Sequence, residues 1–169
     1  EKDITEQSQV VSEADVSMRQ AISLAINDWL LKGYSKDNDV WYCNYPMPPE
    51  LNDEVKPSLD SFTATRVKAF LQNLKQQNPN YYLSDPNVEF VNPQSMPIQD
   101  DFLNSITAKV TEFEVGFDTE DLSQKQDISQ DYMYNYKVWL MYKNLYEWME
   151  DNAGNLTQNI HSTALQATA

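Results

Sequence analysis

The side chains that could take part in catalysis are mostly carboxylates, because the chain has few other reactive groups. Its 169 residues include one histidine, His161, and three glycines, Gly33, Gly116 and Gly154. A Ser-His-Asp triad or a histidine metal site needs a histidine held rigidly in the fold, whereas His161 lies in a polar C-terminal stretch. The Gly-rich phosphate loops of P-loop and Rossmann proteins need several glycines in one turn. We therefore expect neither kind of site.

The acidic residues could in principle support hydrolysis of a glycan. Such an enzyme needs two carboxyl groups about 5–10 Å apart across a cleft. The acids that lie close together in sequence are Asp100-Asp101, Glu112 with Glu114, and Asp118 with Glu120 and Asp121. Alternation along a strand puts Glu112 and Glu114 on the face opposite Phe113 and Val115, which is typical of a solvated face. We assign no catalytic residue and predict that the chain is not an enzyme, and glycan hydrolysis stays an alternative.

Two oxygen-rich turns, Asp37-Asn38-Asp39 and Asp118-Thr119-Glu120-Asp121, leave calcium binding open. Neither has the central glycine and terminal glutamate of an EF-hand loop. We therefore predict no cofactor and no metal ligand, and keep calcium as an alternative. The one cysteine, Cys43, has no partner for an internal disulfide or a zinc site, and it is expected to be a small buried residue.

The charge of the chain restricts its partners. Asp and Glu number 26 against 12 Lys and Arg, which gives a net charge of -14. So negative a surface repels nucleic-acid backbones and anionic lipids. Every apolar run is far shorter than the roughly 20 residues that span a membrane. We expect protein partners, either in self-assembly or in a surface complex, with no nucleic acid and no membrane span.

An amphipathic helix of about twenty residues is predicted to begin at Ser12. Ser12-Glu13-Ala14-Asp15 resembles a capping box, and Val11 and Val16 occupy the staple positions around it. Apolar residues follow at helical spacing, at Met18, Ile22, Ala25, Ile26 and Trp29. Gly33 is expected to end this helix. Residues 1–11 then form a polar tail, residues 12–153 a single α+β domain, and residues 154–169 a second polar tail.

The middle of the chain predicts a long connection, a helix and two strands. All eight prolines lie between Pro46 and Pro97, so irregular structure is concentrated there. A second helix is expected from Ser58 or Ser61 to about Gln77. Strands are expected at Asn87–Val91 and at Ile106–Phe117. In the longer strand the apolar alternation changes phase near Thr111-Glu112, which predicts a bulge or a sharp bend.

A third helix is predicted from Asp127 or Ser129 to about Asn152, and it is rich in aromatic residues. Its apolar side chains fall on more than one side; Val138, Met141, Leu145, Trp148 and Met149 share one of them. A helix that is apolar on most sides is either central to the core or faces a partner, and both readings stay open. The predicted interaction residues are Tyr132, Tyr136, Trp139, Tyr142, Tyr146 and Trp148.

One family resemblance rests on scattered aromatic and proline positions. Trp41-Tyr42-Cys43-Asn44-Tyr45-Pro46 with Pro48-Pro49, followed far downstream by Trp139-Leu140-Met141-Tyr142 and Trp148, resembles the extracytoplasmic regions of uncharacterised, single-pass membrane-anchored archaeal proteins. The resemblance implies an outward-facing domain with a membrane anchor upstream. It implies no activity. The tripeptide Asn155-Leu156-Thr157 is an N-glycosylation sequon, which agrees with an extracellular location.

Together these patterns predict an α+β fold, in which three main helices pack on a small antiparallel sheet beside a long Pro-rich connection. The predicted function is that of a non-catalytic structural or interaction domain at the cell surface, as a subunit of an assembly or filament. The alternatives are a glycan-acting hydrolase that uses paired carboxylates, and a glycan- or solute-binding module that uses Tyr and Trp rings.

Overall fold

The computed structural model describes residues 2–32, 42–43, 45–46, 49–118 and 123–167, with side chains at 5–32, 49–117 and 124–152. The elements follow in the order α1 (Lys2–Leu31), β1 (Tyr42–Cys43), β2 (Tyr45–Pro46), η1 (Leu51–Val55), α2 (Lys56–Gln77), β3 (Tyr81–Leu83), β4 (Asn87–Val91), η2 (Asp100–Phe102), β5 (Ile106–Thr111), β6 (Glu114–Asp118), β7 (Ser123–Asp127), β8 (Gln130–Tyr134) and α3 (Val138–Ala167). The fold is α+β, as predicted.

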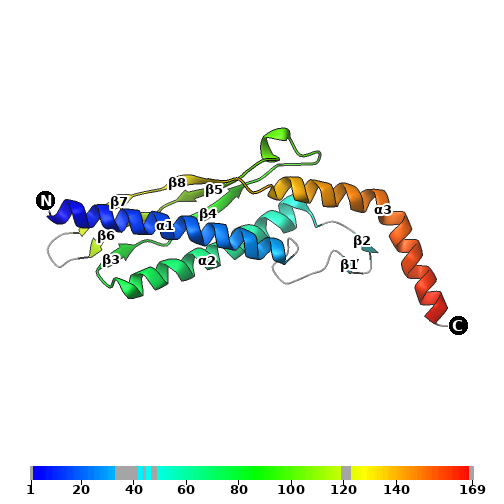
Figure 1. Ribbon diagram of the computed structural model, residues 1–169, viewed down its shortest axis with the longest axis horizontal. Coiled ribbons are helices and arrows are strands. Elements are labelled where there is room, and N and C mark those ends of the chain that lie inside the picture. The colour runs from blue at the N-terminus through cyan, green and yellow to red at the C-terminus, as the bar shows by residue number, and fades with distance from the viewer. Residues whose placement is uncertain (1, 33–41, 44, 47–48, 119–122, 168–169) are drawn as a thin grey trace.

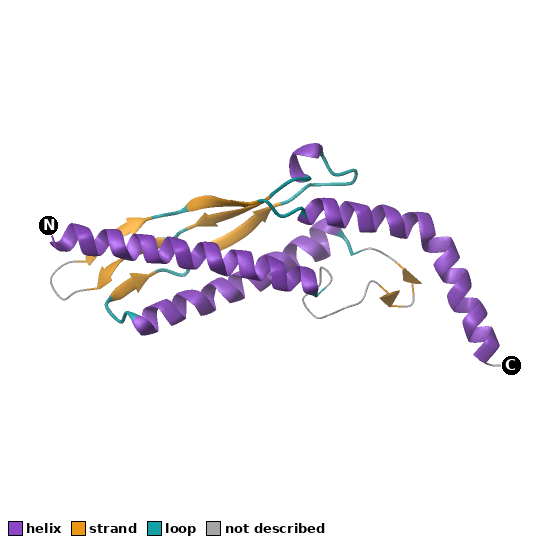
Figure 2. Cartoon of the chain, viewed as in Figure 1, coloured by secondary structure: helices purple, strands orange, loops and turns teal. Residues whose placement is uncertain are grey.

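Two long helices form one layer of the molecule. α1 and α2 lie side by side along its long axis and pack on one face of the strands, while α3 projects beyond them (Figures 1 and 2). The buried residues of α1 recur every three or four positions, which is the spacing of a single helix face. They are Val10, Ala14, Met18, Ala21, Ile22, Ala25, Ile26 and Trp29.

The strands form three extended segments, each interrupted once. β3, β6 and β7 pair antiparallel in one sheet, and β4, β5 and β8 pair antiparallel in the next. Because β5 runs directly into β6, this central segment belongs to both sheets. Its inward residues Ile106, Ala108 and Val110 continue as Phe113 and Val115 after the interruption, all of them buried.

The predicted phase change in the central segment is confirmed as a bulge. The register pairs Val110 with Gln130 and Glu114 with Asp127, so the three residues from Thr111 to Phe113 lie opposite only Ile128 and Ser129. Glu112 takes the left-handed conformation with φ 58°, which non-glycine residues seldom adopt. The bulge returns the apolar side chains to the core face of the sheet.

Serine side chains bridge the bulge on both sides. Ser84 Oγ accepts the Glu114 N–H at 2.8 Å and donates to the carbonyl of Glu112 at 2.8 Å. On the other side Ser129 Oγ accepts the Phe113 N–H at 3.0 Å. Backbone groups that the bulge removes from the strand ladder are thereby satisfied, as buried or half-buried polar groups must be.

Gly116 is required where β6 passes between its neighbours. It pairs with Tyr82 on β3 and with Lys125 on β7. A Cβ at this position would overlap the backbone carbonyl of Gln124, which cannot move away as a flexible side chain would. The Lys125 ammonium lies over the ring of Tyr82, 3.8 Å from its centroid, so the residues that flank Gly116 on either side also contact each other.

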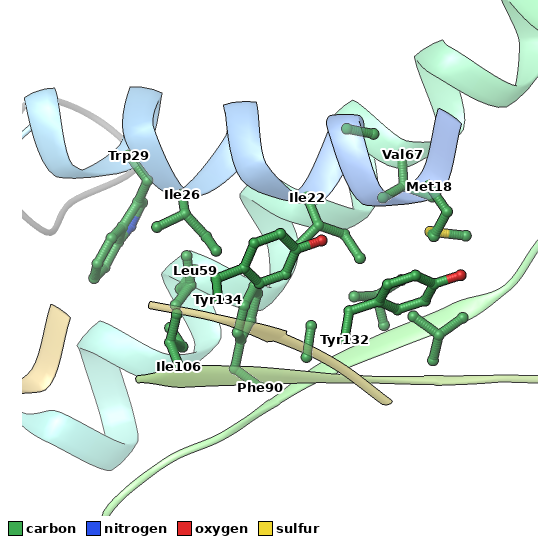
Figure 3. Packing of buried hydrophobic residues seen from close by; sticks show 14 of the residues in the cluster. Met18, Ile22, Ile26, Trp29, Leu59, Val67, Phe90, Ile106, Tyr132 and Tyr134 are labelled. Carbon is green, nitrogen blue, oxygen red and sulfur yellow. The ribbon is translucent and has the colours of Figure 1, made fainter. Parts of the chain in front are cut away.

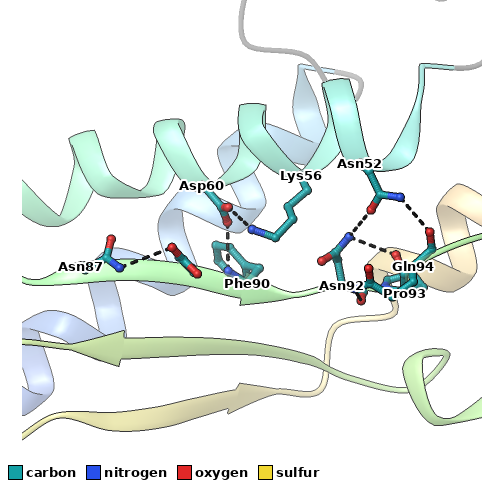
Figure 4. A network of polar contacts seen from close by, with 9 residues as sticks. Asn52, Lys56, Asp60, Asn87, Phe90, Asn92, Pro93 and Gln94 are labelled. Carbon is teal, nitrogen blue, oxygen red and sulfur yellow. Dashed lines mark hydrogen bonds and ion pairs between the residues drawn. The ribbon is translucent and has the colours of Figure 1, made fainter.

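The outer edge of β4 is tied to the α2 layer. Asp60 accepts the Phe90 N–H at 2.9 Å and also pairs with Lys56 (Figure 4). Beyond the strand, the buried side chain of Asn92 donates to Asn52 Oδ1 at 2.9 Å. A carboxylate that occupies an edge N–H leaves fewer free groups for pairing with another chain.

The core lies between the helical layer and the strands. α1 contributes Met18, Ile22, Ile26 and Trp29, which face Phe90, Ile106, Tyr132 and Tyr134 of the sheet, with Leu59 and Val67 from α2 (Figure 3). Trp29 also donates its Nε1–H to Ser58 Oγ at 3.0 Å, which joins α1 to α2. In the described part of the chain, no helix is both long and apolar enough to cross a membrane.

Three predicted boundaries differ from the structure. α1 begins at Lys2 rather than near Ser12, because Val10 already lies on its buried face. The predicted third helix is in its first part the strand β8, and α3 begins only at Val138. α3 continues to Ala167, through the stretch expected to be a polar tail. The predicted stop at Gly33 lies outside the described residues.

Candidate functional site

The six aromatic residues predicted for interaction do not share one surface. Tyr132, Trp139 and Tyr142 are buried, with at most 1% of each exposed, so their rings belong to the core. Tyr136 and Tyr146 are half-buried, and of the six only Trp148, at 49% exposure, is exposed. Asn155 of the sequon lies within α3, in a part whose side chains are outside the described residues.

The tyrosines of β8 and of the residues after it contact α1 in a regular series. Tyr132 donates to Asp15 Oδ1 at 2.7 Å, and Tyr134 donates to the carbonyl of Arg19 at 2.9 Å. The hydroxyl of Tyr136 then lies 2.7 Å from Ser23 Oγ. Positions two apart on a strand share a face, as do positions four apart on a helix. We call these three contacts the tyrosine ladder; it holds α1 in register with β8.

Burial governs the chemistry of the ladder. It raises the pKa of Tyr132 and of Tyr134 far above the usual value for a phenol, and the bond to Asp15 adds to the effect at Tyr132. The guanidinium of Arg19 lies 5.0 Å from the centre of the Tyr132 ring. Such phenols stay protonated at neutral pH and act as hydrogen-bond donors. They are positioned to stabilise the fold.

An open pocket of about 460 Å³ lies between the first half of α1 and the junction of β7 with β8. Its lining mixes polar and apolar groups; it includes two carboxylates, Asp15 and Asp127, and the apolar side chains of Val11 and Ile128. Asp15 accepts hydrogen bonds from Tyr132 and from Gln130, the latter at 2.7 Å. These two donors occupy one oxygen of the carboxylate.

The other carboxylate of the pocket is held in its charged form. Ser129 hydrogen-bonds to Asp127 through its side chain and its N–H, and these bonds lower the pKa of Asp127 below the usual value. A glycosidase needs one carboxyl that keeps its proton until the leaving oxygen takes it. Asp127 is shifted in the opposite direction, so it does not have the environment of a general acid.

The other predicted carboxylate sites are not assembled where the structure describes them. Asp100 and Asp101 are exposed on η2, and Glu112 and Glu114 are exposed at the bulge. Among the described residues, no group of three or more His, Cys, Asp and Glu side chains could hold a metal ion. The turn at 37–39, and residues 119–121 of the second acidic turn, lie outside the described residues.

The first part of α3 is anchored firmly in the core. Val138, Trp139 and Tyr142 are buried, and the Tyr142 hydroxyl donates to the carbonyl of Pro49 at 2.6 Å. Met149, at 3% exposure, is buried about two turns further along. These contacts fix the direction in which α3 leaves the body of the protein at the end opposite the N-terminus (Figure 1).

Beside this anchored face, α3 displays an apolar stripe. The α3 stripe consists of Met141, Leu145 and Trp148, which are 47%, 42% and 49% exposed. Their spacing of four and three residues places them on one side of the helix, over about two turns. The sequence grouped them with Val138 and Met149, and the structure separates that group into two buried and three exposed members. The spacing was visible in the sequence, but the exposure was not.

Acidic side chains surround the neighbouring part of α3. Glu147, Glu150 and Asp151 are exposed on the helix itself. A hydrogen bond to Glu150, with burial and the charges of Glu150 and Glu50, raises the pKa of Tyr146. Carboxylates from α3 and from the start of η1 therefore approach the same tyrosine.

Lys143 lies 3.9 Å from Glu147 and offsets part of the negative charge on this part of α3.

Comparison of the whole chain with protein-family models, with curated proteins and with solved structures finds no match.

Proposed function

We propose that this chain is a non-catalytic interaction domain of an extracytoplasmic assembly, and that α3 makes its contact with the partner. The observation that carries the proposal is the α3 stripe, on a helix that is anchored at its base and extends past the body. Exposed apolar side chains that are contiguous on a helix cost solubility, and a partner that covers them offsets this cost.

The remaining aromatic residues support this choice by their location. Of the residues that could have formed an alternative aromatic surface, Tyr132, Trp139 and Tyr142 are committed to the core and Tyr136 to the tyrosine ladder. Trp148 is left as the aromatic residue best placed to anchor a partner, and tryptophan is enriched among residues that dominate binding energy.

A hydrolytic function has less support from the same structure. The pocket between α1 and the junction of β7 with β8 holds Asp127 with a lowered pKa and Asp15 with an oxygen already bonded. A general acid would need the reverse environment, in which burial or a like charge keeps the proton in place. The extracytoplasmic location rests on the family resemblance and on the acidic composition of the chain.

Site-specific photo-crosslinking in the native host tests the proposal. A benzophenone side chain at Leu145 is expected to give one discrete adduct with a second protein. The same group at Lys109, which is exposed on the open face of the sheet, is the matched control and is expected to give none. Equal labelling from both positions, or no adduct from Leu145, contradicts the assignment of contact to α3.

A further inference from the structure

Three exposed apolar surfaces occur in the described part of the chain, and they differ in continuity. On α1, Val16, Leu24 and Leu31 are exposed but are separated by the exposed polar side chains of Gln20 and Asn27. On the open face of the sheet, Val91 and Met133 stand at the two ends of a row whose middle member is Thr107. The α3 stripe alone has no polar residue between its members along the helix face, so it is the surface that a partner could cover without a break.

The charge next to the α3 stripe defines what can cover it. Beyond Trp148 around the helix come Asn144, Asp151 and then Glu147, all of them exposed, whereas Glu150 lies on the far side of α3 beside Tyr146. Lys143 is the one base on this part of α3, and it already pairs with Glu147. A partner that lies on the stripe brings its own flanking groups close to these carboxylates, within about the 8–10 Å over which charges interact in physiological salt.

We propose that the occupant of the α3 stripe is a cationic amphipathic segment of another protein, with apolar side chains on the stripe and Lys or Arg along its flanks. This proposal rests on the proposed function and adds the chemistry of the partner. Apolar contact supplies the affinity, and the facing charges supply register and a faster association.

A second copy of this chain fits the surface poorly. Self-pairing would bring Glu147 and Asp151 toward their own equivalents, and each copy carries a net charge of -14. Like charges held close together across an interface disfavour the complex strongly. An anionic lipid surface is disfavoured by the same carboxylates.

The test uses the full chain and two synthetic helical peptides with the same Leu/Trp face. One peptide carries Lys and Arg on its flanks, and the other carries Glu at the same positions. Titration calorimetry is expected to detect the cationic peptide and not the anionic one, with binding that weakens as salt is added. Leu145→Asp is expected to weaken binding by more than about tenfold, because it removes apolar burial at the centre of the stripe and places a charge in the contact.

Matched variants separate a local effect from a general one. Glu147→Lys with Asp151→Lys is expected to weaken binding of the cationic peptide severalfold. Asp85→Lys with Glu89→Lys makes the same change in net charge on exposed positions at the sheet and should leave affinity unchanged. Leu24→Asp on α1 is the corresponding control for Leu145→Asp. Circular dichroism checks that each variant is folded.

The proposal fails if the cationic peptide does not bind, if the anionic peptide binds equally well, or if both charge-reversed pairs act alike. It also fails if light scattering finds a dimer that Leu145→Asp abolishes, or if the chain sediments with vesicles of anionic lipid through the same residue. An adduct from Leu145 in cells together with no peptide binding would leave the interaction function standing and refute only the chemistry of the partner.

Discussion

Replacement of Thr63 by valine is expected to make the protein more stable. Thr63 lies on the core side of α2 between Leu59 and Val67, with 0% of its surface exposed. Its hydroxyl oxygen has no hydrogen-bond partner in the part of the chain that the structure describes. A buried polar group without a partner costs about 1–3 kcal/mol, and valine has nearly the same shape without that group.

We therefore expect the free energy of unfolding to rise by about 1–2 kcal/mol in Thr63→Val, on the same scale as the desolvation of one hydroxyl. For a chain of this length, each kcal/mol corresponds to a rise in Tm of about 2–4 °C. Urea unfolding followed by circular dichroism gives the free energy, and a thermal scan gives Tm.

The matched control is Thr65→Val, which lies two residues further along α2 on its exposed side. Thr65 is exposed, and its hydroxyl donates to the carbonyl of Ser61 at 3.0 Å. Exposed substitutions of this kind change stability by about 0.5 kcal/mol or less. If Thr63→Val instead destabilised the protein by more than this, the Thr63 hydroxyl would have to be hydrogen-bonded, and the reasoning from burial would be refuted.

Three further predictions concern the sheet and its tyrosines. Gly116→Ala is expected to destabilise by several kcal/mol, or to prevent folding, because its methyl group meets the β7 backbone; urea unfolding measures this. Burial raises the pKa of Tyr81 to about 12 in the folded state, from about 10 in the unfolded chain. The protonated phenol therefore contributes stability that is fully present below pH 10 and is lost as the pH rises toward 12. Ultraviolet absorbance of tyrosinate should accordingly rise together with alkaline unfolding. Ser129→Ala should raise the pKa of Asp127 toward its usual value in a carbon-13 NMR titration, because it removes the side-chain hydrogen bond that lowers this pKa most. The stability that the lowered pKa gives is present at neutral pH and is lost as pH falls through the pKa of the folded state.

The bulge and the strand before it could be predicted because their signals are local. Asn87–Val91 lies between prolines and alternates in burial, and the structure has a strand with the same bounds. The phase change near Glu112 predicted the interruption, since strand side chains must alternate between faces. The partners of these strands could not be predicted, because β7 is almost wholly polar and offers no apolar alternation.

The wrong predictions share a physical cause. Ser12 has a cap-like sequence, yet Val10 and Ala14 already have the spacing of the buried face, so burial outweighed the local capping signal. Tyr132 and Tyr134 alternate as strand residues do, but their nearness to the helical pattern after Val138 made the whole stretch look helical. Tertiary contact with α1 decides which of these rings are buried, and sequence spacing does not reveal it.

The tyrosine ladder sets a limit on its own length. Four residues of helix advance about 6.0 Å, whereas two residues of strand advance about 6.6–6.8 Å. From Tyr132 to Tyr136 the two spacings therefore drift apart by only about 1–2 Å, which the side chains of the tyrosines and of Asp15 and Ser23 can absorb. Each further tyrosine contact would increase this offset, so a longer ladder could not keep every second strand residue opposite every fourth residue of α1. β8 ends at Tyr134, Tyr136 makes the last contact of the ladder, and α3 begins at Val138. The mismatch between helix and strand spacing therefore keeps the matched stretch of α1 and this segment short.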